Sequence, residues 1–264
     1  MLNLEKINSL EYAENHEKNL EKLNKALRYI SKNIESNNIP TDRECRISMK
    51  TFAGIYDLEK DEKEINRLEL IYAKQAGLPL EKWKENKSKA NGEQLEMLKT
   101  IIFHKNLGSD FIVVRSSRFD DIKNGIDNVI INKKTGDVIC AFDEVCPRKG
   151  DRYTQKQETI LKRNTKGGVS LKYGIKFDGN SEKPSFRGLN GLPIFFLALH
   201  PSEIQKGIDE LNNEHIEKGL FKVFLAEIDM QIKKMEESFS EIHPQLKNQW
   251  VNFHEFIKVH LNKS

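Results

Sequence analysis

The first third of the chain carries a helical pattern. Apolar residues recur every three or four positions among Glu and Lys over residues 9–36, and again over 59–76, which predicts two amphipathic helices. The second run ends at Gly77, as helices commonly do. The polar stretch 84–89 has no apolar residue to anchor it and is the predicted boundary. We therefore expect residues 1–90 to form a helical N-terminal unit.

A different pattern begins in the middle of the chain. Residues 93–104 keep the helical spacing, and three short runs rich in β-branched residues follow at 111–114, 128–131 and 138–142. This order predicts one helix followed by three strands. The last two strands are joined by a turn in which Gly136 can adopt the left-handed conformation. The centre of the chain is therefore expected to hold a β-hairpin.

The elements after the hairpin complete an α/β unit. Residues 152–164 predict a basic helix and 169–177 a strand, which gives the order helix, three strands, helix, strand. A further apolar run at 192–199 predicts another buried strand, and the rest of the chain returns to a helical pattern. We therefore predict an α/β core over residues 91–200 and C-terminal helices over 201–264 that pack on the core.

Composition narrows the class of protein. The chain has 264 residues, of which 31% are charged and 38% hydrophobic, and this balance predicts that most of it folds. A net charge of +3 permits a nucleic-acid partner without requiring one. The three cysteines contain no CxxC pair, which argues against a disulfide framework and a structural zinc site.

The sequence also indicates the cellular compartment of the protein. Its first residues show no basic stretch followed by an apolar run, so we expect neither a secretory signal nor a transit peptide. The longest apolar run, 192–199, is shorter than the roughly 18 residues that a membrane helix needs. A cytoplasmic protein without a membrane partner is the expectation, and the oligomeric state is left open.

Acidic residues mark the predicted hairpin. Asp127 stands at the entrance of one strand, and Asp143 and Glu144 stand at the exit of the next. If the register pairs Asp127 with Asp143, their carboxylates crowd and need a cation or a raised pKa. Mg²⁺, or Mn²⁺, would relieve this repulsion. The alternative is that both strand ends project acidic side chains into water.

The segments 125–131 and 141–145 (GIDNVII and AFDEV) resemble the two acidic motifs of the PD-(D/E)XK nucleases. The resemblance covers about a third of the chain. It implies a restriction-endonuclease-like α-β-β-β-α-β core with helical N- and C-terminal extensions. It also implies that Asp127 and either Asp143 or Glu144 hold the catalytic metal. Glu96, with Glu93 as the alternative, matches the carboxylate that the first helix of that core often supplies.

The family's lysine is missing from its usual place. Val145 stands two residues after Asp143, where that lysine is expected. Some members of the family supply the lysine from the following helix, and here Lys156 is the first candidate and Lys162 the second. Without such a lysine the site would bind metal yet cut nothing.

Basic residues surround these candidates. They are either a contact surface for a phosphate backbone or a solubilising helix face: Arg148, Lys149, Arg152, Lys156, Lys162, Arg163 and Lys166. The segment 115–121, with two arginines and two serines, is a further candidate phosphate contact. Two functions stay open at this point. One is Mg²⁺-dependent phosphodiester hydrolysis, with DNA favoured over RNA as the partner; the other is a non-catalytic nucleic-acid-binding or scaffold protein with a degenerate nuclease fold.

Overall fold

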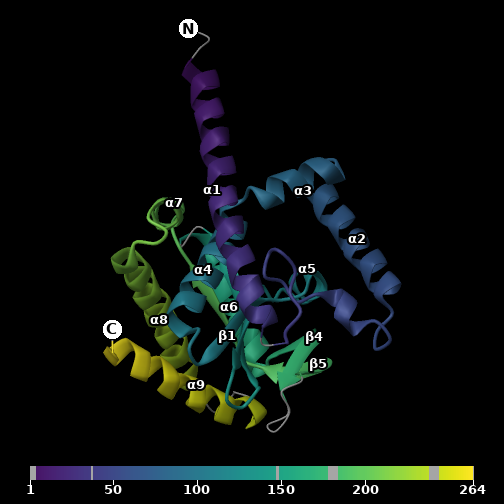
Figure 1. Ribbon diagram of the computed structural model, residues 1–264, viewed down its shortest axis with the longest axis vertical. Coiled ribbons are helices and arrows are strands. Elements are labelled where there is room, and N and C mark those ends of the chain that lie inside the picture. Colours follow the sequence, from purple (N-terminus) through teal and green to yellow (C-terminus); the bar gives the residue numbers. More distant parts are fainter. Residues whose placement is uncertain (1–3, 37, 147–148, 178–183, 238–243, 264) are drawn as a thin grey trace.

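The computed structural model describes residues 4–36, 38–146, 149–177, 184–237 and 244–263. It is a mixed α/β structure in which helices surround a central sheet (Figure 1). The predicted α/β class is confirmed at this level. Within the described part of the chain, none of the helices has an apolar stretch of the length needed to cross a bilayer.

The central sheet has four strands in the order β1-β2-β3-β6. These are β1 (Phe111–Arg115), β2 (Asn128–Asn132), β3 (Val138–Val145) and β6 (Ile194–Ala198). The first three pair antiparallel, and β3 pairs parallel with β6. The predicted hairpin between β2 and β3 is confirmed, with Gly136 at a φ of 72° in its turn, a conformation that glycine adopts without steric cost.

Residues 169–177 form a strand, but the prediction that this strand is the fourth strand of the core is wrong. It is β4 (Val169–Phe177), which pairs with β5 (Pro184–Leu192) in a separate two-stranded sheet. The strand beside β3 is instead β6, within the apolar run 192–199. All five residues of β6 are buried, as expected for a parallel strand covered on both faces, whereas β4 carries lysines and pairs with its neighbour in sequence.

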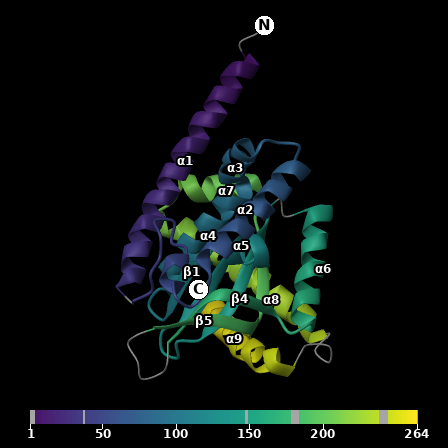
Figure 2. The ribbon, with the colours of Figure 1, turned by 90° about the vertical axis from the view of Figure 1, so that its right-hand side faces the viewer.

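Helices α4 (Asn91–Leu107) and α6 (Asp151–Thr165) pack on opposite faces of the central sheet. Phe142 of β3 contacts Phe103 of α4, with ring centroids 5.6 Å apart. Phe196 of β6, on the other face, contacts Tyr153 of α6 at 5.4 Å. Figure 2 shows α6 on the side of the molecule away from α1. Successive residues of β3 therefore face different helices, because side chains alternate along a strand.

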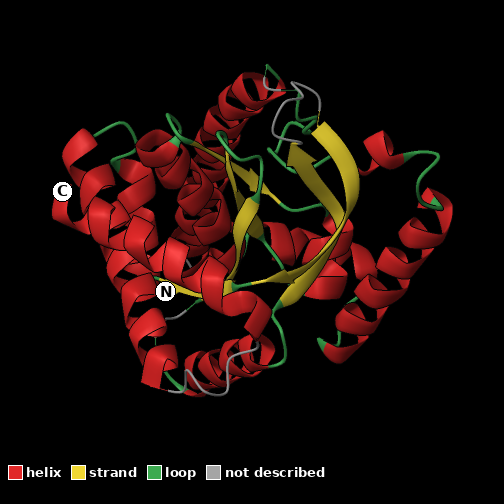
Figure 3. Cartoon of the chain, turned by 90° about the horizontal axis from the view of Figure 1, so that it is seen from below, coloured by secondary structure: helices red, strands yellow, loops and turns green. Residues whose placement is uncertain are grey.

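The outer edge of β6 is covered by α8 (Glu214–Glu237). The backbone amides of Phe196 and Ala198 donate to the side chains of Gln231 and Glu227, at 3.0 and 2.9 Å. Gln231 also donates to the carbonyl of Phe196 at 2.7 Å. These bonds satisfy an edge that would otherwise expose unpaired backbone groups. The other C-terminal helices are α7 (Pro201–Asp209) and α9 (Pro244–Lys263), and Figure 3 shows the helices arranged around the strands.

The N-terminal part is helical, as predicted. It contains α1 (Leu4–Glu35), a short 3-10 helix, η1 (Met49–Phe52), α2 (Leu58–Gln75) and α3 (Leu80–Ser88). The first half of α1 extends beyond the body of the molecule (Figure 1), and its second half packs on α4. The polar stretch 84–89 predicted as a boundary falls mostly inside α3. That helix is held by a ring contact between Trp83 and Tyr72 of α2, a contact that the polar pattern alone does not reveal.

Candidate active site

Three carboxylates converge at one end of the central sheet. Glu96 comes from α4, Asp121 from α5 (Arg118–Asn124), and Asp127 from the residue just before β2. Each offers an oxygen atom, and these atoms lie within 4.8 Å of one another. We call Glu96, Asp121 and Asp127 the carboxylate cluster. Carboxylate oxygens are the ligands that Mg²⁺ and Mn²⁺ prefer, so the cluster fits such an ion, although acidic groups also gather without one.

Asp127 is fixed by the strands around it. Its amide donates to the carbonyl of Phe142 at 2.8 Å, and its carbonyl accepts from the amide of Ser116 at 2.8 Å. Its carboxylate oxygen Oδ2 accepts from the amide of Glu144 at 2.9 Å. The ladder between β2 and β3 ends with the pair Asn128 and Phe142, so Asp127 lies one residue beyond it. The pairing of Asp127 with Asp143 considered from the sequence stays a prediction.

Asp121 is positioned by α5, a helix that the sequence pattern did not predict. Ser117 caps its start by accepting from the amide of Asp120 at 3.1 Å, and Gly125 ends it at a φ of 58°. The buried Asp120 carboxylate accepts from the amides of Lys172 and Tyr173 at 2.7 and 3.0 Å, which ties α5 to β4. Two sequence signals could have revealed this helix: Ser117, three residues before Asp120, marks its start, and Gly125 marks its end.

Asp143 and Glu144 lie inside β3, rather than beyond its end as expected from the sequence. They point to opposite faces of the sheet. Glu144 forms an ion pair with Lys99 of α4, whereas Asp143 forms one with Lys156 of α6, with Nζ 2.7 Å from Oδ2. The structure thus brings Lys156 to Asp143 and places Glu144 with a lysine that the sequence analysis missed. Lys99 lies one helical turn after Glu96 and therefore on the same face of the helix, and this spacing could have identified it from the sequence.

Burial and like charge raise the pKa values of two carboxylates in the cluster. Burial, together with the charges of Glu96, Asp143 and Asp121, raises the pKa of Asp127 well above its ordinary value. Burial also raises the pKa of Glu96, against the opposing charges of two arginines. Because a divalent cation binds the ionised form of these carboxylates, its affinity is expected to increase with pH, which calorimetric titration with Mn²⁺ at several pH values measures.

The two arginines are Arg115 at the end of β1 and Arg46 in the loop before η1. Arg115 is fully buried, and its Nε lies 2.7 Å from Oε1 of Glu96. It also pairs with Glu93. Burial alone would raise the pKa of Glu93, but the charges of Arg115 and Arg46 outweigh it and lower that pKa to about 2. Arg115, predicted as a phosphate contact, therefore lies in a buried ion-pair network, and Arg46 was missed because it is far away in sequence.

Only some of the basic residues predicted around the site lie next to it. Arg163 lies beside the site: its guanidinium donates to the carbonyl of Gly125 at 3.1 Å and lies 3.9 Å from Asp143. Lys149, Arg152, Lys162 and Lys166 are exposed. Arg148 lies outside the described residues. The two serines of the segment 115–121 bond to neighbouring parts of their own chain, so local structure already uses their hydroxyls.

Lys99 gives a testable dependence of stability on pH. Burial lowers its pKa from 10.5 to about 7. Between those pH values the unfolded chain binds a proton on Lys99 that the folded chain has lost together with the charge of its ion pair to Glu144, so the free energy of unfolding should increase with pH. The slope contributed is at most about 1.4 kcal/mol per pH unit. Urea unfolding of the Lys99→Met variant should show this slope reduced.

The control for this prediction is Lys162→Met, which removes an exposed lysine of α6 that forms no ion pair with the described residues and should keep the wild-type slope. Equal slopes for Lys99→Met and the wild type would show that Lys99 keeps its proton in the folded protein.

Comparisons of the chain with protein-family models, with curated proteins and with solved structures gave no significant match. What the site can do is therefore inferred from its own side chains. They are a carboxylate cluster suited to a divalent ion, a lysine bound to the neighbouring Asp143, and arginines that already neutralise part of the cluster.

Proposed function

We propose that this protein is a metal-dependent phosphodiesterase that acts on nucleic acid, with a PD-(D/E)XK type of core. The order α4, β1, β2, β3, α6, β6 supports the proposal, since α6 links β3 to its parallel neighbour β6. The inserted hairpin of β4 and β5 and the short helix α5 are additions to that order. The observation that carries the proposal is the contact of Lys156 with Asp143, beside Asp127.

The carboxylate cluster would hold Mg²⁺ or Mn²⁺, with Asp143 at its border. When bound, such an ion lowers the pKa of a water molecule and polarises the scissile phosphodiester. Among the chain's own groups, the amide of Glu144 orients the Asp127 carboxylate. Glu144 itself, paired with Lys99, is assigned to supporting the site rather than to binding the ion.

Lys156 would take the role of the displaced family lysine. Its ammonium group is half-buried and held by Asp143, which places a positive charge next to the cluster without crowding it. In the transition state of phosphodiester cleavage, negative charge grows on the phosphoryl oxygens, and a cation fixed in advance stabilises that charge. Arg163, on the same side of the site, adds a second cation.

A non-catalytic nucleic-acid-binding or scaffold protein is the second candidate. Val145 in the usual place of the lysine favours it, and so does the neutralisation of Glu93, Glu96 and Asp121 by the chain's own arginines. A buried network of ion pairs of this kind can serve structure alone.

Cleavage assays separate the two candidates. The purified protein is incubated with labelled single- and double-stranded DNA and RNA in the presence of Mg²⁺, Mn²⁺ or EDTA. We expect cleavage that needs the metal, stops with EDTA and returns when metal is added in excess. Nucleic-acid binding without cleavage under every metal condition would favour the non-catalytic candidate.

A further inference from the structure

One cation of the chain already bridges the carboxylate cluster. Arg46 places its NH1 nitrogen 3.0 Å from Oδ2 of Asp121 and its NH2 nitrogen 3.4 Å from Oε1 of Glu96. The same NH2 lies 3.3 Å from Glu93. A guanidinium group and a divalent ion carry charge of the same sign and would bind the same carboxylates. Arg46 and a metal ion therefore compete for two of the three carboxylates.

The loop that carries Arg46 is held against the core. It lies between α1 and η1, outside the α/β core, and is joined to β1 by two backbone bonds: Arg115 donates to the carbonyl of Cys45 at 2.9 Å, and Ile47 donates to that of Arg115 at 3.0 Å. Cys45 has a φ of 62°, a left-handed conformation that is unfavourable for a residue with a β-carbon. Strain of this kind concentrates where a side chain must be aimed.

The same arginine lies in the wall of a cavity. The cavity has a volume of about 450 Å³, and its wall includes Arg46, Ser48, Lys50 and Arg118 together with the acidic Asp42 and Glu62. The carboxylate of Asp42 already accepts from the amides of Glu44 and Arg46, at 2.8 and 2.9 Å. Arg118 is already paired with the buried Glu69, whereas Lys50 is exposed and forms no ion pair with the described residues. Cationic groups and a hydroxyl in one wall are suited to a phosphate group.

We propose that Arg46 closes the carboxylate cluster, and that a substrate phosphate entering this cavity draws the guanidinium away and opens Asp121 to the metal ion, while Arg115 stays on Oε1 of Glu96. The inference rests on the proposed function, because it concerns the same cluster. Phosphate and metal then bind with positive coupling, and linkage requires each to strengthen the other by the same factor. A metal ion is recruited when substrate is present.

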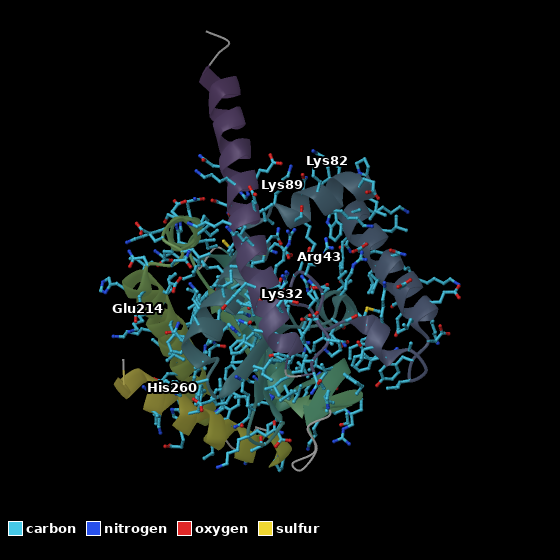
Figure 4. All side chains as sticks on the ribbon, in the orientation of Figure 1. Lys32, Arg43, Lys82, Lys89, Glu214 and His260 are labelled. Carbon is cyan, nitrogen blue, oxygen red and sulfur yellow. The ribbon has the colours of Figure 1, made fainter. Side chains whose placement is uncertain are left out.

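The test measures the affinity of Mn²⁺ by calorimetry, with and without dimethyl phosphate as a probe of a phosphodiester. Arg46→Gln removes the competing charge and is expected to tighten Mn²⁺ binding by about 5- to 150-fold, the usual range of such coupling. Dimethyl phosphate should tighten Mn²⁺ binding to the wild type and have no such effect on Arg46→Gln. The matched control is Arg43→Gln, an exposed arginine of the same loop (labelled in Figure 4), which should behave as the wild type does.

Three outcomes would contradict the inference. Equal or weaker Mn²⁺ binding by a folded Arg46→Gln variant overturns it and leaves the proposed function standing. A wild type whose Mn²⁺ affinity does not respond to dimethyl phosphate also overturns it, and this result holds even if Arg46→Gln fails to fold. Absence of Mn²⁺ binding in the wild type and in both variants overturns the metal site itself, and the proposed function with it. Thermal unfolding of each variant shows which of them are folded.

Discussion

Replacing Asp127 with asparagine is expected to weaken Mn²⁺ binding by at least about 100-fold. Groups that merely support metal ligands change affinity by roughly 10- to 100-fold, and Asp127 is assigned as a ligand itself. Its burial and the neighbouring carboxylates raise its pKa, so a negative charge on Asp127 is unfavourable here without a bound cation. The variant keeps the size of the side chain and an oxygen that can accept from the amide of Glu144. Calorimetric titration with Mn²⁺ measures the effect.

Asp137→Asn is the control for Asp127→Asn. Asp137 lies at the turn end of the same hairpin, where it is exposed and forms an ion pair with Lys176 at 2.9 Å. Its loss should leave Mn²⁺ affinity unchanged, because the residue lies at the opposite end of the strands from the cluster. If both variants weaken binding equally, the ion binds elsewhere or through general surface charge.

The second large effect is expected for Lys156→Met. Removing one preorganised group that stabilises transition-state charge typically lowers kcat by about 10²- to 10³-fold. Mn²⁺ affinity should stay close to the wild-type value, since Lys156 contacts Asp143 and is not assigned as a ligand. Single-turnover cleavage and calorimetry on the same variant separate these two quantities.

Lys162→Met is the matched variant for Lys156→Met. Lys162 lies on the same helix but is exposed, and its loss is expected to change cleavage by much less. A large loss with Lys162→Met and a small one with Lys156→Met would reverse the assignment. Equal small losses would mean that neither lysine stabilises the transition state.

The local elements of the core could be predicted from the sequence, whereas the pairing of the last strand could not. β-branched runs and the glycine turn gave β1, β2 and β3, because strand and turn preferences act over a few residues. Choosing β6 over β4 as the neighbour of β3 depends on which strand is buried on both faces. That choice is set by helices α6 and α8, which pack on β6, and α8 follows β3 only after about 70 residues.

The residues of the candidate site were likewise predictable only in part from the sequence. Glu96 and Asp127 were predicted and lie within one cluster, because each sits at a recognisable place on its own helix or strand. Asp121 was missed because α5 is short and its contribution depends on a chain reversal at Gly125. Arg46 reaches the cluster only through backbone pairing with Arg115. Contacts of this kind depend on the folded arrangement and leave no periodic signal.

Cleavage of labelled DNA in Mg²⁺ by the wild type and by Asp127→Asn, measured side by side, tests most directly whether this site is a metal-dependent phosphodiesterase. We expect the wild type to cleave only when the metal is present, and Asp127→Asn not to cleave although it is folded. Cleavage by Asp127→Asn at the wild-type rate, or by the wild type in EDTA, would contradict the proposed metal-dependent phosphodiesterase site.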